Sequence, residues 1–82
     1  YERAEEMAIA LGNAGRRVET SLEKLFRQER GEAGRREDLL REAADAVYAY
    51  FIQRELCGLK RHDDLVRRLS IPRAVLVRLG AH

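Results

Sequence analysis

The fold is decided by residues 43–52, which read AADAVYAYFI and include a single charged side chain, Asp45. This run and its flanks place apolar residues on two helical stripes, rotated from each other: Leu40, Ala43, Val47 and Phe51, and then Ala49, Ile52, Leu56 and Leu59. A helix that faces one partner shows a single apolar stripe, whereas a helix that is apolar nearly all round is buried. The pattern therefore predicts a central helix over residues 37–57, with residues 43–59 buried on nearly every side.

A second long helix is expected over residues 2–30. Its apolar residues recur at steps of three and four, which gathers them on one stripe: Met7, Leu11, Ala14, Val18, Leu22 and Leu25. Gly12 and Gly15 interrupt this pattern at a cost of about 1 kcal/mol each relative to alanine. They indicate either the close approach of a neighbouring backbone or a kink. The short connection over residues 31–36, which begins at Gly31, makes the two helices antiparallel neighbours.

Two short helices are predicted within residues 62–80. Before them, Gly58 suits the left-handed position that ends a helix, and Leu59 is placed for the apolar contact of a Schellman turn. Pro72 suits the first turn of the last helix. The composition is rich in Ala, Leu, Glu and Arg, which favour helices, and no useful period-two alternation occurs. The predicted fold is all-α: one domain over residues 1–82, with a long antiparallel hairpin and two short C-terminal helices.

The two stripes of the central helix also predict an assembly, because one antiparallel neighbour cannot cover both of them. Either the C-terminal segment or a second copy of the chain must cover the rest. We expect a homodimeric helical bundle whose interface contains four residues of the central helix: Tyr48, Tyr50, Ile52 and Leu56. Arg54 and Glu55 lie in the same helix and require partners, because an unpaired buried charge is costly. Those partners lie either within the chain or across the dimer.

Residues 63–79 resemble a helix-turn-helix, because apolar residues occupy its five interior positions: Leu65, Leu69, Ile71, Leu76 and Leu79. Basic residues also outnumber acidic ones in residues 60–82, and four of them are candidate contacts to nucleic acid: Arg67, Arg68, Arg73 and Arg78. The segment departs from the motif at several positions. Val66 and Ser70 replace the usual alanine and glycine, and Pro72 and Val77 fall where a recognition helix would present polar groups. A corner that caps the core is therefore the favoured interpretation, with a DNA-binding regulator as the alternative.

No catalytic residue, metal site or cofactor is expected, and we predict that the protein is not an enzyme. The run from His62 to Asp64 does not suit a metal ion, because adjacent side chains do not converge on one ion. Cys57, the single cysteine, is expected to pack as a small hydrophobe, and its lack of a partner favours a reducing compartment. No apolar run approaches the length of a membrane span. The expected function is that of a soluble, cytoplasmic interaction or scaffold protein that acts as a homo-oligomer, with no small-molecule substrate.

Three stretches resemble a known family: residues 15–19 (GRRVE), residues 51–59 (FIQRELCGL) and residues 71–80 (IPRAVLVRLG). The family is one of small bacterial all-helical proteins of unknown function. This resemblance implies a bacterial, cytoplasmic setting. It implies no activity, cofactor or catalytic residue, because none is known for the family.

Overall fold

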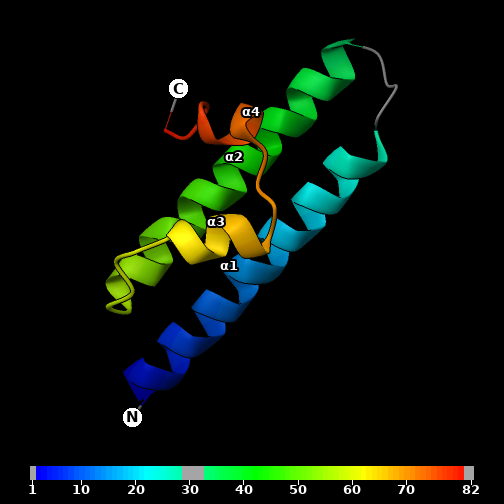
Figure 1. Ribbon diagram of the computed structural model, residues 1–82. Coiled ribbons are helices and arrows are strands. Elements are labelled where there is room, and N and C mark those ends of the chain that lie inside the picture. The colour runs from blue at the N-terminus through cyan, green and yellow to red at the C-terminus, as the bar shows by residue number, and fades with distance from the viewer. Residues whose placement is uncertain (1, 29–32, 81–82) are drawn as a thin grey trace.

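The computed structural model describes residues 2–28 and 33–80. This part of the chain folds into four helices and contains no strand: α1 (Glu2–Arg27), α2 (Ala33–Leu56), α3 (Asp63–Arg68) and α4 (Arg73–Leu76). The two long helices run antiparallel as a hairpin, and α3 and α4 lie across one side of it (Figure 1). The predicted all-α hairpin with two short C-terminal helices is confirmed.

The core lies in the middle of the hairpin, where the C-terminal segment covers it. Its buried residues come from both long helices and from the C-terminal segment: Val18, Leu22 and Leu25; Leu39, Leu40, Ala43, Ala44, Ala46 and Val47; and Ile71 and Val75. The contribution of α1 is one stripe at helical spacing, as expected of a helix that faces one partner. Between residues 43 and 47, α2 is buried round most of its circumference, because α1 and the C-terminal segment both pack against it.

The ends of the long helices differ from the prediction. The α2 helix begins at Ala33 rather than at residue 37, because Arg35 and Arg36 are good helix formers that continue the helix without any apolar periodicity. The predicted connection over residues 31–36 therefore included residues that belong to α2. The α1 helix ends at Arg27, and Gln28 is no longer helical. The proposed cap at Gly31 and the last residues of the predicted first helix lie outside the described residues.

The two glycines of α1 lie in a continuous helix, and only one of them packs closely against the partner helix. A Cβ atom added at Gly15 would lie 3.4 Å from Cζ and Oη of Tyr50. Gly15 therefore accommodates a tyrosine ring of α2, not the neighbouring backbone that the sequence suggested. At Gly12 the nearest atoms belong to the side chain of Arg16 in the same helix.

The end of α2 has the predicted Schellman turn. Gly58 adopts a φ of 90°, in the left-handed region that favours glycine. The Leu59 backbone N–H donates to the Arg54 carbonyl at 2.8 Å, and the Gly58 N–H donates to the Glu55 carbonyl at 3.0 Å. These are the two hydrogen bonds that define the motif. The turn directs residues 59–62 back toward the hairpin.

The burial of the central helix is narrower than predicted. Full burial extends from Ala43 to Val47, interrupted by the exposed Asp45, whereas Ile52, Leu56 and Leu59 are exposed in this chain. The expectation that residues 43–59 are buried on nearly every side is therefore wrong for the single chain. Ile71 and Val75 of the C-terminal segment belong to the same buried cluster as the first half of α2. One side of the second half of α2 stays exposed to solvent.

Candidate interaction surface

An exposed apolar stripe runs along the second half of α2. Tyr48, Ile52 and Leu56 follow one another at intervals of four residues, and Leu59 lies in the segment that follows the helix. Their exposed fractions are 43%, 41%, 67% and 44%. We call these four residues the α2 stripe. Residues four apart lie one above the other on a helix, so Tyr48, Ile52 and Leu56 share one face of α2.

The two stripes predicted for α2 have different environments. Leu40, Ala43 and Val47 of the first stripe are buried in the hairpin. The second stripe is open to solvent from Ile52 onward. One apolar face of α2 therefore has a partner within the chain, and the other has none among the described residues.

A hollow opens beside the α2 stripe, and charged residues of both signs border it. Its lining consists of Ile52, Glu55, Leu56 and Lys60. Glu55 carries a negative charge at the end of α2, and Lys60 carries a positive charge on the loop that follows. The stripe thus combines an apolar centre with a rim of opposite charges.

Three of the four residues predicted for the dimer interface lie together on the α2 stripe: Tyr48, Ile52 and Leu56. Tyr50 lies elsewhere, half-buried in the hairpin against Gly15, with the Arg54 guanidinium 5.8 Å from the centre of its ring. Leu59 was not among the predicted interface residues, although its place on the second apolar stripe of the sequence could have indicated that it belongs there.

Arg54 and Glu55 find their partner within the chain, at His62. The Arg54 Nε–H donates to Nδ1 of His62 at 3.1 Å, and Nε2 of His62 lies 2.9 Å from Oε2 of Glu55. The imidazole also stacks on the Phe51 ring, with 4.1 Å between centroids and 2° between planes. This role of His62 was not predicted from the sequence.

These contacts determine which ring nitrogen of the neutral His62 side chain carries the proton. An arginine Nε is always a donor, so Nδ1 of His62 must be the acceptor and Nε2 must carry the proton that is donated to Glu55. Arg54 donates a further hydrogen bond from Nη2 to the Arg61 carbonyl at 3.1 Å. We call this set of contacts the His62 pin. It fastens the loop of residues 57–62 to the end of α2.

The C-terminal corner, residues 63–79, buries its predicted interior positions against the hairpin. Leu65 and Ile71 are buried, and Leu69, Leu76 and Leu79 pack against the core while partly exposed. This agrees with the interpretation of the corner as a cap.

The corner lacks the recognition helix of a helix-turn-helix. The α4 helix is a single turn, Arg73–Leu76. Ser70 occupies the turn with a φ of 52°, the left-handed conformation for which glycine is usual.

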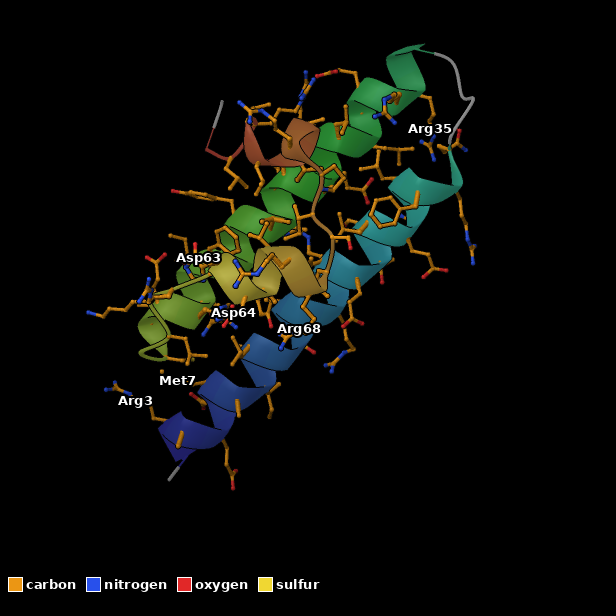
Figure 2. The ribbon with its side chains drawn as sticks, viewed as in Figure 1. Arg3, Met7, Arg35, Asp63, Asp64 and Arg68 are labelled. Atoms are coloured by element: carbon orange, nitrogen blue, oxygen red, sulfur yellow. The ribbon has the colours of Figure 1, made fainter. Side chains whose placement is uncertain are left out.

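Two of the four candidate nucleic-acid contacts are engaged in ion pairs. The Arg78 guanidinium donates two hydrogen bonds to the Glu37 carboxylate, each 3.0 Å long, and a third to the Ala74 carbonyl at 2.5 Å. Arg67 pairs with Asp64 on the surface of α3. Arg68 and Arg73 are exposed. Figure 2 shows Arg68 on α3 together with Asp63 and Asp64, so negative charge accompanies the positive charge on this helix.

The comparison with known families agrees with the resemblance found in the sequence. Residues 1–82 match the model of a family of unknown function, DUF6665. The chain belongs to this family. No curated protein and no solved structure matches the chain.

Within residues 2–28 and 33–80, no group of three or more His, Cys, Asp or Glu side chains is arranged to hold a metal ion. None of the described helices is both long enough and apolar enough to cross a membrane.

The pair of Glu37 and Arg78 predicts a component of acid sensitivity. The hydrogen bonds from Arg78 lower the pKa of the Glu37 carboxyl below its usual value of 4.5. Because the folded-state pKa is the lower one, the pair stabilises the fold above the unfolded-state pKa, and this contribution is lost as the pH falls through the folded-state pKa. We expect Glu37→Gln to reduce the urea midpoint at neutral pH and to flatten its decline below about pH 4.5. Glu6→Gln, at an exposed position of α1, serves as the control and should leave the acid profile unchanged.

Proposed function

We propose that this protein is an interaction module that forms a homodimer through the α2 stripe. The observation that carries the proposal is the exposure of Tyr48, Ile52 and Leu56 on one face of α2, with Leu59 exposed in the segment that follows the helix. Single exposed apolar residues are common on protein surfaces, but contiguous apolar patches with a polar rim mark interaction sites. A tyrosine at one end of such a patch fits an interface, where this residue type is enriched.

Charge complementarity favours a second copy of this chain as the occupant. Glu55 and Lys60 border the same hollow with opposite charges. In a two-fold symmetric interface each copy presents the same surface to the other. A rim that carries both signs can then match itself, with the Lys60 of one copy near the Glu55 carboxylate of the other. The net charge of +2 on 82 residues adds only weak repulsion between copies.

The size of the chain gives a second reason for association. A domain of this length buries only about 60–65% of the surface that its unfolded chain exposes, and oligomerisation is one common means of stabilising such domains. Pairing along the α2 stripe would cover the half of α2 that the C-terminal corner leaves open. We further propose that the module carries no chemistry of its own and acts in the bacterial cytoplasm. The support for that setting is the single cysteine and the resemblance noted in the sequence.

Substitution of Leu56, the most exposed residue of the α2 stripe, tests the proposal. A glutamate at this position would place a charge at the centre of the interface, where an unpaired buried charge is costly. We expect Leu56→Glu to be monomeric by light scattering at concentrations at which the unmodified chain is dimeric. Because Leu56 is exposed in the single chain, its fold should persist by circular dichroism.

The matched control is Phe26→Glu, which adds the same charge at an exposed apolar residue in the last turn of α1, away from the end of α2. We expect this variant to stay dimeric. If Leu56→Glu has the same mass as the unmodified chain, the α2 stripe is not the interface. If both variants are monomeric, the effect is not specific to the stripe, and the proposal fails in this form.

DNA binding through the C-terminal corner has less support. Its last helix is one turn long, and Arg78 is engaged by Glu37. The exposed Arg68 and Arg73 could contact phosphates, which adds affinity without sequence selectivity. Titration of a generic DNA duplex at low and high salt examines this alternative. Tight, salt-dependent binding that is lost in the double variant Arg68→Ala, Arg73→Ala would favour it over the interaction module.

A further inference from the structure

The His62 pin controls the position of one end of the α2 stripe. The loop of residues 57–62 carries Leu59, the last residue of the stripe, and Lys60, on the rim of the hollow. The Schellman turn at Gly58 holds one end of this loop. The other end is held by the hydrogen bonds of His62 to Arg54 and Glu55. Loss of the second attachment would free Leu59 and Lys60 from one of their two anchors.

The hydrogen bond from Arg54 requires a neutral imidazole. Nδ1 of His62 accepts from the Arg54 Nε–H at 3.1 Å, and a proton on Nδ1 would place two N–H groups and two positive charges against each other. The Glu55 carboxylate, 2.9 Å from Nε2, would attract the imidazolium in the opposite direction. Protonation therefore exchanges two hydrogen bonds on opposite sides of the ring for an ion pair on one side.

Apart from the ion pair with Glu55, the charges near His62 do not compensate for the lost hydrogen bond from Arg54. Arg61 and Asp63, the neighbours of His62 in sequence, pair with each other at 3.8 Å on the surface. Arg54 keeps its hydrogen bond to the Arg61 carbonyl and its place near the Tyr50 ring. The guanidinium therefore stays close to His62, and it would repel the protonated imidazole. The side chain of His62 is only 15% exposed. Water therefore has little access to accept hydrogen bonds from the Arg54 Nε–H and the protonated Nδ1, which would then face each other.

We propose that His62 is a pH-sensitive switch for self-association. In its neutral form, with the proton on Nε2, His62 holds the loop of residues 57–62, which places Leu59 in the α2 stripe and Lys60 on the rim of the hollow. A second proton on Nδ1 breaks the bond to Arg54, loosens that end of the stripe and weakens the dimer. This inference rests on the proposed function, because the output of the switch is the interface described above.

The test compares the dimer dissociation constant at about pH 8 and about pH 5, the range in which histidine changes charge. Loss of one hydrogen bond, with a net contribution of about 1 kcal/mol, should raise the constant of the unmodified chain by about fivefold at the lower pH. In His62→Gln the side-chain oxygen can accept from Arg54 and the amide can donate to Glu55 without titrating. We expect the dissociation constant of this variant to change little. His82→Gln removes the other of the two histidines and should keep the pH response.

A measurement on the monomer separates the switch from the dimer. In Leu56→Glu, nuclear magnetic resonance should show the backbone amides of Leu59 and Lys60 shifting with pH, and adding His62→Gln should abolish this titration. At high pH the imidazole nitrogen shifts should identify Nε2 as the protonated nitrogen. If no dimer forms at either pH, the proposed function fails while these spectra still decide on the switch. A pH response unchanged by His62→Gln, or amides of the loop that do not titrate, would overturn the switch itself.

Discussion

Replacing Leu39 with alanine should destabilise the fold by about 2–5 kcal/mol, because it leaves a cavity in a core that has little stability to spare. Leu39 is one of the two leucines among the most completely buried side chains, with 1% of its surface exposed, and it lies in the cluster that joins the hairpin to the C-terminal corner. A domain of 82 residues is stable by only about 4–12 kcal/mol in total. The substitution should therefore remove a large share of the folding free energy.

Urea unfolding followed by circular dichroism measures this loss. The matched control is Ile9→Ala, which removes an aliphatic side chain of similar size at a position of α1 that is 63% exposed. We expect the control to change the free energy of unfolding by no more than about 0.5 kcal/mol. Equal losses in the two variants would show that the core does not lie where the structure places it.

Replacing Val75 with aspartate should detach the C-terminal corner from the hairpin. Val75 is completely buried in α4, and a carboxylate there must either enter the core unpaired or pull the helix into solvent. The expected loss of stability is more than about 3 kcal/mol. Hydrogen exchange should accelerate first in the described residues 63–79, and then in α2 over residues 39–47, from which the cover is removed.

The control for this prediction is two residues away in the same corner. Val77 is 63% exposed, so Val77→Asp introduces the same charge without burying it. We expect its stability to lie within about 0.5 kcal/mol of the unmodified chain. Comparable losses in Val75→Asp and Val77→Asp would mean that the corner does not pack through Val75.

The features that depend on local pattern could be predicted from the sequence. The spacing of Val18, Leu22 and Leu25 identified the buried face of α1, and Gly58 identified the end of α2, because both signals lie within a few residues of the structure they specify. The exposed beginning of α2 gave no such signal. Arg35 and Arg36 favour a helix but face solvent, so no apolar periodicity marks the residues at which α2 begins.

The features that depend on how elements face one another could not be predicted. The apolar periodicity of α2 shows that two faces can be buried, but not which neighbour covers each of them. The place of Tyr50 follows from the rotation of α2 relative to α1, which puts its ring against Gly15. The His62 pin depends on the path of the loop after Gly58, which brings His62 back to residues seven and eight positions earlier.

The α2 stripe connects these observations, because it is the part of the predicted central helix that the single chain leaves uncovered. If it is a dimer interface, the sequence predicted the burial of α2 correctly for the assembly and wrongly only for the isolated chain. If it is not, the apolar residues from Tyr48 to Leu59 require another partner.

Sedimentation equilibrium of the unmodified chain across micromolar concentrations at neutral pH tests this point most directly. The homodimer predicts a mass approaching twice the 9.5 kDa of the single chain, with dissociation toward the monomer on dilution. A single species of 9.5 kDa over the whole range would contradict it.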